Sequence, residues 1–311
     1  MSWRLRGIRL AFRALEPVSV RASGALAEQL FFRPPRARLP ASAQPLLARA
    51  RRSWLAVDAV SVPSWHWGEG PLVALAHGWG SRGGRLTSLV EPLLARGFSV
   101  VTFDAPGHGE SDSRLGSIPQ SARTLRALEA AAGPLHAVVG HSLGAAATAL
   151  AVSRGLDLAR AVFIAPPASP LAYVEAFARS LGVSAAVMAE MRRRSQERLR
   201  FNWEDLDVVA MAERSRGIPL LVVHDEGDRE VLPDDGAAIA GAWPGARLVT
   251  TRGLGHHRIT RDPDAIAQVV DFLAEGVAPR RPVPGLEASA ETIWLERILF
   301  ERESRSIPAR L

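Results

Sequence analysis

The stretch Val138-Val139-Gly140-His141-Ser142-Leu143-Gly144-Ala145-Ala146 decides the fold. Its first residues continue an apolar run from Leu135, interrupted only by His136, which predicts a buried strand, and the small residues after Gly144 predict the start of a helix. The order G-x-S-x-G has a steric reason. A turn this tight brings the residues two before and two after the serine into near contact, so only very small side chains fit there. The stretch therefore predicts a strand, a sharp turn and a helix, with the hydroxyl of Ser142 presented as a nucleophile.

Apolar segments alternate with helix-like segments along much of the chain. Strands are expected at 54–60, 64–67, 72–76, 98–103, 135–139, 161–165, 218–223 and 246–250. Continuous apolar strands that alternate with helices are typical of a parallel sheet covered on both faces. Ligands bind to such sheets at the carboxyl ends of the strands. The sequence thus predicts an α/β fold with a mostly parallel sheet and a site at those strand ends.

The same pattern suggests how the chain is divided. We expect an N-terminal helical arm over 1–53, an α/β core over 54–275, and a linker rich in proline and arginine followed by a C-terminal helix over 276–311. Within the core, residues 168–217 interrupt the alternation and predict two or three helices. An insertion at this point of such a sheet is expected to form a lid over the site.

The composition argues against several classes of function. All 38 basic residues are arginine, the net charge is only +6, and no basic patch is interleaved with aromatic residues, so nucleic-acid binding is not expected. The chain has no cysteine, which excludes a thiol nucleophile and thiolate metal sites. The histidines lack metal-ligand spacing. We expect neither a metal nor a cofactor.

The N-terminal residues are amphipathic but do not form a secretory signal. No run of eighteen apolar residues is present to span a membrane, and 1–15 lack a continuous apolar segment, so a cytoplasmic protein is expected. Arginines alternate there with apolar residues, which favours a helix packed on the protein's own body, with a helix at a membrane surface as the alternative. Residues 286–302 are also amphipathic and would suit packing on the body or on a second subunit.

A serine hydroxyl needs an adjacent base that is itself oriented by an acid. Asp225 and Asp228 follow the strand expected at 218–223, and His256 and His257 follow the strand expected at 246–250. The order serine, aspartate, histidine is the one expected on this kind of sheet. The residues alone leave open which aspartate and which histidine take part.

At this point the chain resembles the α/β-hydrolase fold family over about residues 54–275. The resemblance rests on five motifs in order: His77-Gly78-Trp79-Gly80, Asp104-Ala105-Pro106-Gly107-His108-Gly109-Glu110-Ser111, the turn at Ser142, the Asp228 loop and Gly255-His256. It implies that Ser142 is the nucleophile, His256 the base and Asp228 the acid. It also implies that the backbone N–H groups of Trp79 and Leu143 form the oxyanion hole, where fixed donors stabilise developing charge.

One position departs from the family pattern. The family loop usually has a strand, His-Gly, two residues, Asp, two residues and Val, which matches Asp228 and Val231 but places Asp225 where glycine is expected. Asp225 therefore remains an alternative acid, and His257 an alternative base. Three other residues are expected to have structural roles: Asp104, His77 and His108. The side chain of His141, which directly precedes the serine, is expected to point away from the Ser142 hydroxyl.

The resulting hypothesis is hydrolysis of a small-molecule carboxylic ester through an acyl-enzyme, without a cofactor. Alternatives are the same triad acting on an amide, a lactone or a carbon–carbon bond next to a carbonyl, a lipase at a membrane surface, and a non-catalytic ligand-binding protein that retains the fold. A serine at the turn argues against epoxide hydrolysis and dehalogenation, because in this fold both need an aspartate there.

Overall fold

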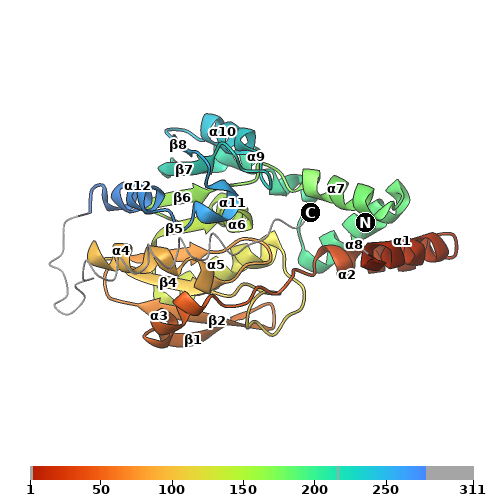
Figure 1. The fold of residues 1–311 in the computed structure, drawn as a ribbon, viewed down its shortest axis with the longest axis horizontal. Helices are drawn as coiled ribbons and strands as arrows, with labels where there is room; N and C mark the ends of the chain where they lie inside the picture. The colour runs from red at the N-terminus through yellow and green to blue at the C-terminus, as the bar shows by residue number, and fades with distance from the viewer. Residues whose placement is uncertain (1–2, 216, 278–311) are drawn as a thin grey trace.

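The computed structural model describes residues 3–215 and 217–277. Within these ranges eight strands form one sheet in the order β1-β2-β4-β3-β5-β6-β7-β8 (Figure 1). They are β1 (Arg51–Val57), β2 (Val60–Trp67), β3 (Leu72–Ala76), β4 (Ser99–Phe103), β5 (Leu135–His141), β6 (Arg160–Ile164), β7 (Leu220–Asp225) and β8 (Arg247–Thr251). Strands β3 to β8 pair in parallel, whereas β1 and β2 are antiparallel to their neighbours. The α/β fold with a mostly parallel sheet is confirmed.

A hairpin interrupts the single strand expected at 54–60, so that prediction was wrong there. β1 ends at Val57, which pairs with Val60 at the start of β2. The two turn residues, Asp58 and Ala59, have φ of 49° and 61°. Two-residue turns with positive φ at both positions usually contain glycine, as in Asp-Gly. Because alanine stands here instead, the sequence carried no clear signal of the turn.

Helices cover both faces of the sheet (Figure 1). α5 (Ile118–Ala132), α6 (Leu143–Ser153) and α10 (Pro233–Ala242) contribute to the hydrophobic cluster that contains Val138, and α4 (Val90–Ala95) and α12 (Pro263–Ala274) to the cluster that contains Val139. These adjacent residues of β5 face opposite sides because side chains alternate along a strand. The central strand is therefore buried on both faces, which explains its continuous apolar sequence.

The N-terminal helices lie beside the helices inserted between β6 and β7. α1 (Trp3–Leu15) and α2 (Val20–Phe31) gather with α7 (Leu171–Leu181) and α8 (Ala185–Leu199) at one end of the sheet (Figure 1). The remaining short elements are α3 (Gln44–Ala48), α9 (Val208–Met211), α11 (Gly255–Arg258) and 3₁₀ turns at Ala41–Ala43, Gly83–Arg85, Thr87–Leu89, Trp203–Leu206 and Ala212–Arg214. The helices expected within 168–217 are thus present.

The contact between α2 and α8 is close and charged. Glu28 of α2 is 2% exposed, and its carboxylate accepts hydrogen bonds from Nε of Arg194 at 3.0 Å and of Arg198 at 2.6 Å. A Cβ added to Gly24 would lie 2.4 Å from Cγ of Glu190. The arm and the insertion therefore pack against each other as a unit.

One face of α1 packs against the protein. Phe12 is buried, and Nε of Arg9 donates to the carbonyl oxygen of Ser180 at 2.9 Å. Trp3 and Leu10 on the other face are 75% and 62% exposed. None of the helices in the described part of the chain is long and apolar enough to cross a membrane. The linker and C-terminal helix expected over 276–311 lie, beyond Val277, outside the described residues.

Candidate active site

Ser142 occupies the turn between β5 and α6 with a strained backbone. Its φ of 53° and ψ of −120° are unusual for a residue with a side chain. A Cβ on Gly140 would lie 2.6 Å from Cα of Ala145, and one on Gly144 would lie 2.0 Å from the carbonyl oxygen of Ala76. The two glycines are therefore required by close approach of the backbone, and the serine sits at the carboxyl end of a central strand.

His256 and Asp228 come together from neighbouring loops. Nδ1–H of His256, in α11 after β8, donates to Oδ2 of Asp228, in the loop after β7, at 2.7 Å. Both side chains are buried. Because Nδ1 holds the proton of this bond, Nε2 of the neutral ring is the nitrogen that can accept another proton.

Asp228 is held as a carboxylate. Its Oδ1 accepts from the backbone N–H of Glu230 at 2.9 Å and of Val231 at 3.0 Å, and its Oδ2 also lies 3.5 Å from Nε2 of His224. Burial by itself raises the pKa of Asp228, but the hydrogen bonds from His224, His256 and the backbone outweigh it and hold the pKa well below its usual range. A negative charge is therefore fixed beside His256.

Asp225 and His257, the alternative acid and base, have other hydrogen-bond partners than Asp228 and His256. The carboxylate of Asp225 accepts hydrogen bonds from the N–H of Gly227 and Leu254 and from the hydroxyl of Thr251. The ring of His257 is 64% exposed, and its Nε2 lies 3.0 Å from Oε1 of Glu230. The structure thus pairs His256 with Asp228 and directs His257 to the surface.

The residues expected to hold the oxyanion belong to two segments that come close to Ser142. Leu143 begins α6, so its N–H belongs to the first turn and has no acceptor within the helix. The loop containing Trp79 approaches the turn closely, since a Cβ on Gly78 would lie 3.0 Å from Cβ of Ser142. The arrangement places backbone from both predicted segments next to Ser142.

Buried polar residues fix the loops around the site. His77 donates from Nδ1 to the carbonyl oxygen of Gly78 at 2.8 Å and accepts at Nε2 from the N–H of Ala105 at 3.0 Å. Asp104 accepts from the N–H of Gly83 and from Arg82. His108 donates from Nδ1 to a carbonyl oxygen of its own loop, and its ring lies edge-on to that of Trp79, 5.3 Å away. The hydrogen bonds of these side chains go to the loops around Ser142, which is what a structural role would require.

Sequence reasoning assigned no role to His224, which lies against Asp228. It is 1% exposed, and its Nε2 donates to the carbonyl oxygen of Val231 at 3.1 Å while lying 3.5 Å from Asp228. The feature of the sequence that could have indicated this contact is the position of His224 at the end of an apolar strand, directly before the loop that carries Asp228. A buried histidine at that point is available to contact the loop.

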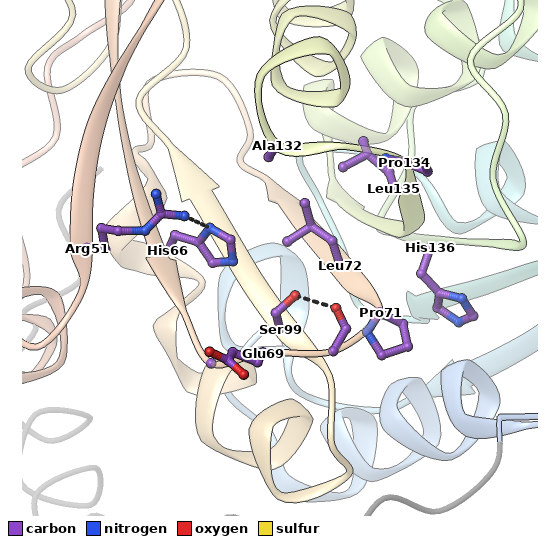
Figure 2. Close-up of a pocket in the computed structure, with 12 residues that line it drawn as sticks. Arg51, His66, Glu69, Pro71, Leu72, Ser99, Ala132, Pro134, Leu135 and His136 are labelled. Carbon is purple, nitrogen blue, oxygen red and sulfur yellow. Dashed lines mark hydrogen bonds between the residues drawn. The ribbon is translucent and has the colours of Figure 1, made fainter.

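A depression of about 790 Å³ lies at the opposite edge of the sheet (Figure 2). Its lining includes Leu72, Ser99 and Leu135, the first residues of β3, β4 and β5, so it lies at the amino-terminal ends of these strands. Arg51 and His66 also line it and are joined by a hydrogen bond of 2.9 Å from Arg51 to Nδ1 of His66. Because ligands of such sheets bind at the carboxyl ends of strands, we assign this depression no catalytic role. In the described ranges, no three histidine, aspartate or glutamate side chains are grouped to hold a metal ion.

The sheet order, the strained serine and the His256–Asp228 pair define an α/β-hydrolase architecture. The sequence model described as the alpha/beta hydrolase family matches residues 73–269. The chain belongs to this family.

Curated relatives and a solved structure agree with this assignment. The chain is 28% identical over 251 residues to a pimeloyl-[acyl-carrier protein] methyl ester esterase from Stenotrophomonas maltophilia, covering 68% of this chain and 96% of that enzyme. The enzyme of the same name from Chromobacterium violaceum is 44% identical over 79 residues, which span 25% of this chain and 29% of that enzyme. An esterase from Rhodococcus sp. ECU1013 shares the fold with a TM-score of 0.55 at 19% identity, covering 72% of this chain and 98% of that one.

Proposed function

We propose that this protein is a serine hydrolase that cleaves a carboxylic ester through an acyl-enzyme intermediate. The observation that carries the proposal is the 2.7 Å hydrogen bond from His256 to Asp228 near the strained turn of Ser142. A base oriented by a carboxylate is what a serine hydroxyl needs to react at neutral pH.

In the first half of the reaction, Oγ of Ser142 attacks the ester carbonyl and its proton passes to Nε2 of His256. Asp228 stabilises the imidazolium that forms, and the N–H groups of Trp79 and Leu143 stabilise the oxyanion. Collapse of the tetrahedral intermediate breaks the bond to the alcohol, which leaves with the proton from His256. Water then attacks the acyl group by the same route, releasing the carboxylic acid and restoring the serine.

The family relatives support an ester as the substrate. The relatives from Stenotrophomonas maltophilia and Chromobacterium violaceum are named as methyl ester esterases. The same three residues would also serve on an amide, a lactone or a carbon–carbon bond next to a carbonyl. A panel of p-nitrophenyl esters of increasing acyl length, measured beside a p-nitroanilide and a lactone, discriminates these reactions.

Labelling with a fluorophosphonate tests the nucleophile directly. We expect wild-type protein to be labelled on Ser142, and Ser142→Ala to lose both the label and ester hydrolysis. Ser153→Ala is the matched control, since this serine lies at the end of α6 and bonds to the carbonyl oxygen of Leu150. Hydrolysis that survives in Ser142→Ala, or the absence of any reaction with probe or ester, would contradict the proposal.

We further propose that residues 168–217 serve as a lid. The hydroxyl of Tyr173 in α7 donates to the carbonyl oxygen of Glu230 at 3.4 Å, which brings the insertion to the Asp228 loop. Substitutions on α7 are therefore expected to change the preference for acyl length. Equal losses on all esters of the panel would argue against this role.

A second candidate, action on esters at a lipid surface, is favoured by the exposed face of α1. Trp3, Gly7, Leu10 and Ala14 lie on one side of this helix and are exposed. The exposed Arg6 and Arg13 lie next to this stripe, along one side of it, an arrangement that suits an anionic lipid surface.

Co-sedimentation with phosphatidylglycerol vesicles tests this candidate. We expect binding that weakens in a Trp3→Ser, Leu10→Ser double variant and that is unchanged in Trp54→Ser, which removes an exposed tryptophan of β1. No sedimentation with anionic vesicles, or equal loss in the control, would count against it.

A further inference from the structure

The departure from the family pattern at Asp225 has a structural consequence. Asp225 is the last residue of β7 and pairs in register with Thr251, the last residue of β8. It is completely buried. A buried carboxylate is costly unless its oxygens are satisfied by hydrogen bonds. A glycine at this position would need no such partners.

The two oxygens of Asp225 bond to two different loops. Oδ1 accepts from the N–H of Gly227 at 2.9 Å, within the loop that carries Asp228. Oδ2 accepts from Oγ1 of Thr251 at 2.8 Å and from the N–H of Leu254 at 2.9 Å, in the loop that carries His256. One side chain therefore links the two loops across the sheet edge.

These partners lie close to the reacting groups in the chain. Gly227 directly precedes Asp228, and Leu254 stands two residues before His256. The backbone N–H of Glu226 donates to the carbonyl oxygen of Thr251 at 2.9 Å and continues the pairing of the strands. This bond does not reach the residues that follow, from which Asp228 and His256 project. Hydrogen bonds to an ionised acceptor are short and strong, so the carboxylate restrains both loops at the points from which the acid and the base project.

The ionised state of Asp225 fits this arrangement. Burial raises its pKa, but hydrogen bonds from the N–H of Leu254 and of Gly255, from Thr251 and from Gly227 together lower the pKa below its ordinary value. Asp225 and Asp228 are thus both carboxylates, each with its own set of hydrogen-bond donors. The donors of Asp225 come from Gly227, Thr251 and Leu254, so they leave His256 to Asp228.

We propose that Asp225 is a positioning residue that holds the Asp228 loop against the His256 loop and so sets the geometry of their hydrogen bond. The proposal rests on the function proposed above for Ser142, His256 and Asp228. Asp225 does not contact substrate in it. The residue replaces the glycine of the family pattern with a crosslink between the acid and the base.

Variants of the crosslink test the proposal. Asp225→Asn keeps the shape but turns an N–H group toward backbone N–H donors, and Thr251→Val removes one donor. We expect each to lower kcat on p-nitrophenyl acetate about three- to tenfold, the size expected for one lost hydrogen bond, with little change in KM. The acid limb of the pH profile of kcat/KM should also move to lower pH, because a less well-placed Asp228 stabilises the imidazolium less. Thr251→Ser, which keeps the hydroxyl, should behave like wild type.

A spectroscopic readout separates this proposal from the proposed function. A proton shared between a histidine nitrogen and a carboxylate gives a strongly downfield proton resonance, which His256→Ala identifies by its loss. We expect Thr251→Val to shift or broaden this resonance, and Thr251→Ser to leave it in place. If wild type shows no hydrolysis, the proposed function fails while the resonance still tests the crosslink. If Thr251→Val is folded and leaves the resonance, kcat and the pH profile unchanged, the crosslink is overturned, even where Asp225→Asn does not fold.

Discussion

The imidazole of His141 donates a hydrogen bond of 2.9 Å from Nε2 to the main-chain carbonyl oxygen of His256. The two rings lie 4.8 Å apart. Burial, and next to it the neighbouring His256, lower the pKa of His141 to about 3, so the ring is neutral near pH 7. Because His141 directly precedes Ser142, this bond joins the turn of the proposed nucleophile to the loop of the proposed base.

We expect His141→Ala to lower kcat about tenfold without a comparable change in KM, because a lost buried hydrogen bond lets the His256 loop shift relative to Ser142. His257→Ala should retain activity, since that ring is exposed and bonds to Glu230. Steady-state kinetics on one ester, with circular dichroism to confirm folding, makes the comparison. A larger loss in His257→Ala than in His141→Ala would reverse our placement of the base.

The two aspartates should differ sharply in their effect on turnover. Asp228→Asn removes the carboxylate that orients His256, a change that costs on the order of ten-thousandfold in a serine-protease triad, and we expect a loss of at least about a hundredfold in kcat here. Asp225→Asn should lose less than about tenfold, because its bonds position loops and do not contact the ring. His256→Ala should fall to the level of Ser142→Ala, since base and nucleophile act together. If Asp225→Asn lost more kcat than Asp228→Asn, the acid would have been assigned to the wrong aspartate.

Stability should fall as the pH drops below neutrality. Burial is the main cause that lowers the pKa of three histidines from 6.5, to about 4 for His77 and to about 3 for His108 and His141. Between those values and 6.5 the unfolded chain binds protons that the folded chain does not. Each histidine therefore removes up to about 1.4 kcal/mol of stability per pH unit in that window, and none above it.

Urea unfolding at a series of pH values between about 5 and 8 measures this dependence. We expect the free energy of unfolding to be constant near neutral pH and to decline below the ordinary pKa of histidine. The slope of this decline should correspond to about one proton fewer in His108→Gln than in wild type. A free energy of unfolding that stays constant down to about pH 5 would contradict the neutral, buried state of these rings.

The sequence predicted the parts of the site that depend on local sterics and chain order. The turn at Ser142 is visible because only glycine fits at positions 140 and 144, where added atoms would lie within 2.6 Å of the backbone. The choice between Asp225 and Asp228 could not be made in the same way. It depends on the donors that the next strand and loop bring to each carboxylate, and Thr251 and Leu254 are more than twenty residues away in the chain.

The hairpin at Asp58-Ala59 and the partnership of α2 with α8 were missed for related reasons. The hairpin lacks the glycine that usually marks such a turn. Glu28 lies in an otherwise ordinary amphipathic segment, and nothing local indicates that its carboxylate is buried between two arginines more than 160 residues later.

The contact between α2 and α8 should contribute measurably to stability. Glu28→Gln leaves Arg194 and Arg198 without their buried carboxylate, and a broken buried pair is costly because the remaining groups stay desolvated. We expect a loss of about 1–3 kcal/mol in the free energy of unfolding, or selective release of residues 1–31 to protease if the arm detaches before the core unfolds.

Glu197→Gln is the matched control on α8, because its pair with Arg193 is largely exposed and such pairs contribute little. Gly24→Ala, one turn before Glu28 on α2, should also weaken the contact, since the added methyl group meets Glu190 of α8. Equal stability and equal protease resistance of Glu28→Gln and Glu197→Gln would mean that the arm is held by its apolar contacts alone.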